Sequence, residues 1–407
     1  PVAWESDSDT DLCTGNAVTP NFALSGIALG STLLAPSGGA AASLAVSRYD
    51  HVASASATQT VSQSLSEVGV FRLTATPPTY LGVTMPASQS APVGRITPYD
   101  FYLSGGALTP ACNADFSYMD QPFGVTYTLT ARNSSGATTT NYTGSFAKGT
   151  TALVAENGDD GVDRSSRLST ISASWSKGIQ SVSAAPVTFS RLAETTPDGP
   201  FSSLAVGVSV AANDTLSAAL TNADMNPATA GTCTTCTAGK LGTQRLLAGR
   251  LNAGSARGAP ESAQVVPLQL EYWSGTAWTR NTADSCSQLM LGNSGGFLFD
   301  RTWNASTRTL TLANSASSVL GLSASRDASG TASATAQSGY LWLHFSAPGV
   351  NDRVHYQVGL AAQSPASSWL RYDWNGDGTA AQDESGGWVF FNRWRGSDRI
   401  IYRREAW

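Results

Sequence analysis

The chain contains 407 residues, of which 41% are hydrophobic and 13% are charged, and its formal net charge is −5. A chain of this length folds as two or three globular domains more often than as one. Its 24 lysine and arginine residues form no basic run, so the electrostatic footprint of a nucleic-acid-binding protein is missing. No apolar stretch of about 18 residues is present to span a bilayer. We therefore expect no nucleic-acid partner and no membrane-spanning segment.

Alternation of apolar and polar residues with period two is the dominant pattern, as in 125–131, where Val125, Tyr127, Leu129 and Ala131 alternate with threonines. No segment of 12 or more residues keeps an uninterrupted helical stripe of apolar residues. The sequence therefore predicts an all-β protein, built from tandem immunoglobulin-like β-sandwich modules with antiparallel sheets. The expected strands, in chain order, are 70–76, 125–131, 187–191, 204–210, 265–273, 307–312, 340–345 and 354–360.

Two shifts in composition suggest module boundaries. A proline-dotted passage covers 77–98, and a passage rich in threonine, alanine and asparagine covers 215–241. We predict an N-terminal immunoglobulin-like module at 1–96, a central β-sandwich at 97–243 and a tryptophan-rich C-terminal β-sandwich at 244–407. The sequence opens at Pro1 without a charged and apolar leader, so we expect a mature or trimmed piece of a longer protein.

The cysteine count is odd, which leaves at least one cysteine unpaired or bonded outside the chain. The close pair in Cys-Thr-Thr-Cys has the spacing of half a zinc site, but a second such pair or a histidine pair is absent. We predict a local disulfide between the cysteines of this close pair, formed in an oxidising compartment. Disulfides between distant segments are an alternative that the sequence does not assign. The candidates are Cys13, Cys112, Cys233, Cys236 and Cys286.

An acidic segment near the C-terminus has the spacing of a calcium loop, with oxygen ligands at alternating positions, then a glycine, then a late acid. An EF-hand also needs flanking helices, but Gly386, Gly387 and an aromatic strand-like run follow. The sequence therefore predicts a Ca²⁺ loop between strands; the alternative is a turn whose side chains bond only their own backbone. The predicted ligands are Asp373, Asn375, Asp377, Thr379, Asp383 and Glu384.

A second acidic cluster runs from Glu156 to Asp163, and its spacing fits no standard metal loop. Metal binding and a solvated turn both remain open for this segment.

Catalytic motifs are missing from the sequence. Only three histidines are present; His344 and His355 lie in expected strands and could face each other, although strand histidines are more often packed or exposed without a catalytic role. No nucleophile elbow, phosphate-binding loop or dinucleotide fingerprint occurs in a strand-to-helix context. The separation of two carboxylates in a glycoside hydrolase is set by the fold and not by the sequence, so a carboxylate pair for glycoside hydrolysis remains an alternative at this point. We predict a protein that is not an enzyme and assign no catalytic residue.

Tryptophans in the C-terminal third are compatible with a packed core or with an aromatic platform for sugar rings. Trp388 and Trp394 share the parity of Phe390 and Asn392, so we expect that strand face to point inward. Trp374 lies inside the acidic loop and is the candidate ligand-contacting aromatic residue. A carbohydrate-binding module or carbohydrate-active enzyme is the first alternative function.

Arginines punctuate the last two expected strands. Charged residues on a terminal strand commonly protect a sheet edge from pairing with another chain. The same feature also fits a docking edge, so a structural subunit that polymerises by strand addition is the second alternative. The arginines are Arg393, Arg395, Arg399, Arg403 and Arg404.

Several segments together resemble the long C-terminal region, of unassigned function, in the bacterial MSHA biogenesis proteins called MshQ. The resembling segments are 13–22, 66–71, 116–123, 141–148, 369–378 and 395–402. The resemblance implies a secreted or outer-membrane-associated protein on the surface of a Gram-negative bacterium. It also implies a role in type IV pilus assembly or attachment, with pilus components, a surface receptor or a glycan as partners. It transfers no catalytic residues, and only the loop 373–378 carries over as a motif.

These observations favour a non-catalytic, extracytoplasmic array of β-sandwich modules, in which Ca²⁺ stiffens the C-terminal module.

Overall fold

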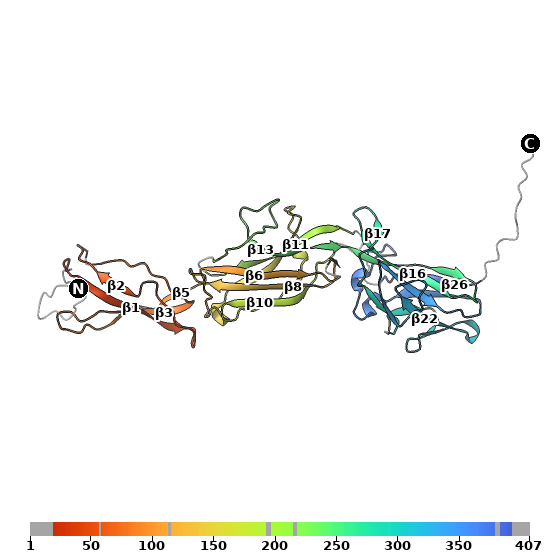
Figure 1. Cartoon of the computed structure of the whole chain (residues 1–407), viewed down its shortest axis with the longest axis horizontal. Helices are drawn as coiled ribbons and strands as arrows, with labels where there is room; N and C mark the ends of the chain where they lie inside the picture. The colour runs from red at the N-terminus through yellow and green to blue at the C-terminus, as the bar shows by residue number, and fades with distance from the viewer. Residues whose placement is uncertain are drawn as a thin grey trace, which may run out of the picture.

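The computed structural model describes residues 19–56, 58–112, 115–192, 197–214, 218–292, 294–378 and 383–392. Within these ranges the chain is built from strands and short 3-10 turns, and the described residues contain no α-helix. Nothing helical in them has the length and apolar character needed to cross a bilayer. The expectation of an all-β protein with several antiparallel sheets is confirmed. Figure 1 shows the strands in three groups that follow one another along the longest axis.

The N-terminal group is one five-stranded sheet, in which β5 pairs with β3 beside the path β2-β1-β3-β4. Its strands carry few fully buried side chains, and β1 has only intermediate and exposed positions. The strands are β1 (Leu24–Ala35), β2 (Arg48–His51), β3 (Gly69–Thr76), β4 (Ser88–Gln89) and β5 (Val93–Ile96).

The middle group is a sandwich of two four-stranded sheets, β10-β8-β6-β12 and β7-β13-β11-β9. Strand β8 alternates strictly between buried and half-buried residues, as its sequence predicts, because one face packs on the opposite sheet. The strands are β6 (Asp100–Thr109), β7 (Phe116–Tyr118), β8 (Phe123–Arg132), β9 (Thr150–Asn157), β10 (Ile179–Val187), β11 (Phe201–Ala211), β12 (Ala219–Leu220) and β13 (Ala238–Leu247).

The C-terminal group packs a seven-stranded sheet against a four-stranded one, with a further two-stranded sheet. The larger sheet contains β14 (Gly249–Ala253), β16 (Gln264–Trp273), β17 (Trp278–Arg280), β20 (Thr302–Asn304), β21 (Thr309–Thr311), β22 (Ser317–Ser323) and β24 (Tyr340–Phe345). The smaller one contains β15 (Ala256–Gly258), β19 (Phe297–Phe299), β25 (Asp352–Val358) and β26 (Gly386–Phe391), and the pair is β18 (Gln288–Met290) with β23 (Ser333–Thr335).

Three strand pairs are parallel, which the expectation of antiparallel sheets did not include: β12 with β6, β7 with β13, and β15 with β26. Each of these pairs involves a strand of two or three residues at the margin of a sheet. Short marginal strands are reached by long connections rather than hairpins, so their direction is free of the hairpin constraint.

Two expectations about individual strands are wrong. Strand β10 occupies 179–187, and the expected strand at 187–191 contributes only an isolated bridge from Phe189 to Leu168. On β26 the inward residues are Val389 and Phe391, both 0% exposed, whereas Trp388 is 37% exposed. Both faces of β26 are apolar in sequence, so period-two parity could not tell which face meets the core. Trp394 lies outside the described residues.

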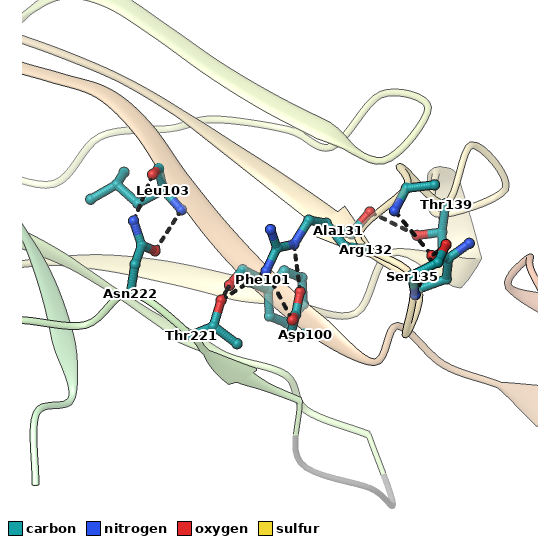
Figure 2. Close-up of polar contacts among 11 residues, drawn as sticks. Asp100, Phe101, Leu103, Ala131, Arg132, Ser135, Thr139, Thr221 and Asn222 are labelled. Carbon is teal, nitrogen blue, oxygen red and sulfur yellow. Dashed lines mark hydrogen bonds and ion pairs between the residues drawn. The ribbon is translucent and has the colours of Figure 1, made fainter.

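The margin of the sheet at β6 is covered by side chains that imitate a strand, as Figure 2 shows. The Asn222 carboxamide accepts from the Leu103 N–H at 3.0 Å and donates to the Leu103 carbonyl at 2.8 Å. Arg132 donates two bonds to the Asp100 carboxylate, at 2.8 and 3.0 Å, and a third to Thr221. Asn222 therefore continues the pairing of the two-residue strand β12 as far as Leu103 of β6.

Candidate functional sites

The predicted calcium loop brings three carboxylates together. One carboxylate oxygen each of Asp373, Asp377 and Asp383 lies within 4.8 Å of the others. Asp373 is buried, Asp377 is exposed and Asp383 is intermediate, so the cluster opens to solvent on one side. The residues meet because Gly376 and Gly378, both with positive φ, let the chain curl around the Asp373 carboxylate.

The Asn375 side chain lies between two of these acids. Its Nδ2 donates to Asp377 Oδ2 at 3.0 Å and to Asp383 Oδ1 at 2.9 Å. The side-chain NH₂ group of Asn375 therefore lies between the two carboxylates, where a cation would be bound. A half-turn of the amide would present Oδ1 to the same point, at the expense of the bond that Oδ1 now accepts from the Asp377 N–H at 2.8 Å. The resulting donor set consists of carboxylate and amide oxygens, which is the chemistry that Ca²⁺ prefers.

The same acids also accept bonds from their own backbone, as the turn alternative expects. Asp373 accepts from the N–H groups of Gly376, Asp377 and Gly378 at 2.7, 3.1 and 3.0 Å. Asp383 accepts from the N–H of Trp374 at 2.9 Å. Asx-type bonds of this kind shape the loop and hold its carboxylates in place.

Glu384, the acid that the spacing rule places at the end of the loop, is engaged elsewhere. Its Oε1 pairs with Arg371 at 2.5 Å and its Oε2 accepts from the Leu360 N–H at 3.0 Å. Asp383, the spare acid of the motif, is the residue that joins Asp373 and Asp377. Thr379 lies outside the described residues.

Trp374 is 38% exposed, but its ring already has two neighbours. The Arg250 guanidinium lies 4.7 Å from its centroid, and the Tyr372 ring meets it edge-on at 5.3 Å. Arg250 also lies 4.3 Å from the Trp278 ring and forms a 2.6 Å ion pair with buried Glu271. Cation–π contacts of this kind anchor the acidic loop on the sheet, and they occupy ring surface that a sugar would need.

The base of the acidic loop is tied to the middle group by Arg191. Its guanidinium donates to the carbonyls of Arg371 at 2.8 Å, Gly249 at 2.9 Å and Trp369, and pairs with Asp120 at 3.1 Å. One side chain of the middle group thus satisfies three backbone carbonyls of the C-terminal group.

A second link joins the same two groups covalently. Cys112, just before β7, forms a disulfide with Cys286, which is 174 residues away. Cys112, Phe116 and Tyr118 are all buried in the core of the C-terminal group, although they belong to the middle group by position in the chain. The predicted local disulfide is also present, between Cys233 and Cys236. Cys13 lies outside the described residues.

The junction between the N-terminal and middle groups is held by Glu67 and Asn141. Glu67 Oε1 accepts from the N–H and hydroxyl of Thr140 at 2.9 and 2.8 Å, and Oε2 accepts from the Asn141 N–H at 3.1 Å. Asn141 donates to the carbonyls of Ala40 and Val68 at 2.9 Å and accepts from the Ala40 N–H at 2.7 Å. Both side chains are buried, and their polar atoms are matched.

The second acidic segment shows no convergence of three carboxylates among the described residues. Asp160 forms a bidentate ion pair with Arg164, at 2.9 and 2.8 Å, and Asp163 accepts from Ser165. Glu156 is 2% exposed, and its Oε2 has no hydrogen-bond partner among the residues that the structure describes. Burial is the main cause that raises the pKa of Glu156, and the charge of Asp159 adds to it.

The two strand histidines do not face each other. His344 lies on β24 and His355 on β25, which belong to different sheets, and on both strands the residues that alternate with the histidine face the core. Burial lowers the pKa of His344, and within the described part of the chain its Nε2 has no hydrogen-bond partner. The rings therefore lie on opposite outer faces of the C-terminal sandwich, because each strand turns its aliphatic side inward.

Sequence reasoning missed the residues of both junctions. Glu67, Tyr118 and Asn141 belong to no motif, although they lie in segments 66–71, 116–123 and 141–148 of the MshQ resemblance. No sequence pattern marks Arg191 or Asp284, since each acts by bonding to a residue more than 100 positions away in the chain: Arg191 to Arg371, and Asp284 to Tyr118.

Sequence models of three consecutive domains match this chain: the second domain of DUF6701 at residues 1–62, the third at 67–240 and the fourth at 247–406. No curated protein matches it. Among solved structures, the Escherichia coli adhesin FdeC is 12% identical with a TM-score of 0.35, over 90% of this chain and 86% of that one. The Yersinia pseudotuberculosis adhesin InvE is 13% identical with a TM-score of 0.23, over 72% of this chain and 58% of that one. Likeness this distant says nothing of what the chain binds.

Proposed function

The chain belongs to the DUF6701 family, and we propose that it is a non-catalytic, stiff β rod of the bacterial cell surface. Its task is to hold other parts of a surface assembly at a fixed distance and orientation. The observation that carries this proposal is that both junctions between successive sheet groups are bonded through buried side chains. Domains that move freely share small, wet interfaces, whereas here the first junction has matched polar atoms and the second has a covalent bridge.

The first junction supports stiffness because the buried side chains of Asn141 and Glu67 are already engaged in hydrogen bonds across it. The Asn141 carboxamide makes three hydrogen bonds, two with the Ala40 backbone and one with the Val68 carbonyl. The Glu67 carboxylate accepts hydrogen bonds from the backbone N–H and the hydroxyl of Thr140. Bending at this point would leave buried acceptors and donors unpaired, at a cost of about 1–3 kcal/mol for each group.

The second junction is stiffer still. The disulfide Cys112–Cys286 and the bond between Tyr118 and Asp284 form one cluster, in which the Cys286 sulfur lies 3.5 Å from the Asp284 carboxylate. Arg191 adds bonds to three backbone carbonyls of the C-terminal group. Together these restraints oppose bending as well as separation of the two groups.

Small-angle X-ray scattering of the whole chain tests the rod. The wild-type curve should fit a single extended shape, and Asn141→Ala should require a distribution of bend angles at the first junction. Asn304→Ala is the matched control, because the Asn304 side chain accepts its bonds from a turn in the C-terminal group, away from the first junction. A wild-type curve that already requires many orientations would refute the proposal.

We further propose that the surface assembly is an MSHA-like type IV pilus. The resemblance to MshQ supports this assignment, and the disulfides are compatible with an oxidising, extracytoplasmic location. The purified chain should co-sediment with sheared MSHA-type pili, and a denatured and alkylated sample should not. Failure to co-sediment with the pili would count against the pilus, but not against the stiff rod.

Calcium binding at Asp373, Asn375, Asp377 and Asp383 is part of the proposal. The oxygen-only donor set and the convergence of three carboxylates support it. A bound ion would cancel repulsion among the acids and fix the loop whose base Arg191 holds at the junction.

A further inference from the structure

Strand β9 is an open edge of the middle sandwich, unlike the other three outer strands of its two sheets. Strand β12 is two residues long and β7 is three, so neither is long enough to pair with an added strand. Strand β10 carries a bulge between Val182 and Ala185 and a proline at Pro186. Strand β9 runs for eight residues, with no proline and no break in its register with β11. Natural proteins protect long sheet edges by such devices, so their absence from β9 is informative.

The pairing register shows which backbone groups of β9 point outward. The N–H of Ala155 donates to the Ser165 hydroxyl at 3.1 Å, and its carbonyl accepts from the Arg164 N–H at 2.9 Å, so both groups point away from β11. Bonding direction alternates along an antiparallel pair. Leu153 and Thr151 therefore point their N–H and C=O groups outward as well. Among the described residues, no hydrogen bond reaches these four groups from outside β11.

A groove lies along this edge. Two cavities of about 420 and 510 Å³ adjoin at Thr151 and Ile171, between β9 and the segment 165–174. The groove ends where partners are already present: Ser165 satisfies Ala155 at one end, and at the other the Gly149 carbonyl accepts from Trp175 Nε1 at 2.8 Å. The free stretch between these ends is short, with two donors and two acceptors.

The chemistry of the walls selects the occupant. None of the residues that line the two cavities is charged, and most are serine, threonine, alanine or isoleucine. A charged side chain entering here would lose water without gaining a counter-ion. An extended polypeptide with small, uncharged side chains meets both requirements, since its backbone supplies the missing partners for the edge.

We propose that β9 is an acceptor edge that binds an extended, uncharged, small-residue segment of another polypeptide by strand addition. The incoming segment lies between β9 and 165–174 and exchanges four backbone hydrogen bonds with Thr151 and Leu153. This goes beyond the stiff rod, because it assigns a place where the rod holds a partner.

The test uses the whole chain and a labelled peptide of eight residues in which threonine alternates with valine and alanine. A second peptide has the same sequence with every internal backbone amide N-methylated, which removes the donors of both edges and blocks pairing. Fluorescence anisotropy should show binding of the first peptide and at least about tenfold weaker binding of the second. Hydrogen exchange of the bound chain should slow in 149–155.

Variants locate the site. Ser166→Arg and Thr170→Arg place a bulky charge at exposed positions in the groove wall without touching β9, and each should abolish peptide binding. Ser183→Arg, at an exposed position on β10, is the matched control and should bind normally. Equal binding of the N-methylated peptide, protection confined to other segments, or no binding of the first peptide would overturn the proposal.

Discussion

The Tyr118 hydroxyl donates a 2.8 Å hydrogen bond to the Asp284 carboxylate, joining a strand of the middle group to a loop of the C-terminal group. Asp284 is fully buried and accepts from the N–H groups of Cys286 and Ser287 and from the Ser287 hydroxyl. Burial and the charge of Asp284 raise the pKa of Tyr118 well above its usual range. The phenol therefore stays protonated and remains a donor.

Replacing Tyr118 with phenylalanine should lower the free energy of unfolding by about 1–3 kcal/mol, because a buried carboxylate loses one of its donors. Urea denaturation measures this change. Tyr99→Phe is the control, since Tyr99 is 68% exposed and should show no comparable loss. An unchanged midpoint for Tyr118→Phe would show that water replaces the phenol and that the contact does not brace the junction.

Removing the long-range disulfide should destabilise the chain much more than removing the local one. Cys112→Ser with Cys286→Ser releases a crosslink across 174 residues, at an expected cost of about 2–5 kcal/mol. Cys233→Ser with Cys236→Ser releases a loop of three residues and should cost about 1–2 kcal/mol. Thermal unfolding of both double variants provides the comparison, and equal losses would contradict the role of Cys112–Cys286 as a brace.

Glu156→Gln should stabilise the protein at neutral pH. The raised pKa means that the folded state holds the Glu156 proton more tightly than the unfolded state does. This contribution is therefore greatest below the unfolded pKa of about 4.3 and is lost as pH rises through the folded pKa. At pH 7 the wild type keeps a buried charge whose Oε2 is unpaired, and the glutamine variant does not.

Denaturation at pH 3 and pH 7 separates these states. The variant should gain stability over the wild type only at the higher pH. Asp327→Asn, at an exposed position, should differ from the wild type at neither pH beyond a few tenths of a kcal/mol. A loss of stability in Glu156→Gln at pH 7 would mean that the carboxylate is a needed ligand or ion-pair partner.

Calcium should raise the melting temperature, and excess EDTA should lower it again, because a ligand that binds only the folded state stabilises it by mass action. Asp377→Asn and Asp383→Asn should each weaken this response by removing a converging carboxylate. Asp327→Asn should respond as the wild type does. A transition that calcium and EDTA leave unchanged would remove the metal from the proposal.

Glu384→Gln distinguishes the two acids at the end of the acidic loop. Since Glu384 pairs with Arg371 and the Leu360 N–H, its loss should lower the melting temperature both with and without calcium. The difference between the two conditions should stay close to that of the wild type. If the calcium response disappears instead, Glu384 is a ligand, as the spacing rule predicts.

The sequence by itself determined the strands that alternate cleanly. Residues 125–131 fall in β8, because period two leaves only one face able to enter the core. It also determined that Asp373, Asn375 and Asp377 lie close together, since two glycines make the chain curl within a few residues. The sequence is enough to predict a contact wherever the contacting residues are close neighbours in the chain.

The tertiary structure alone decided the features that join distant residues. It paired Cys112 with Cys286, buried Tyr118 in the C-terminal core and turned Val389 rather than Trp388 inward. It also replaced Glu384 by Asp383 in the acid cluster, because Arg371 competes for Glu384. Contacts of this kind depend on how whole sheets pack, which no window of sequence encodes, so the junctions that make the molecule a rod became visible only in three dimensions.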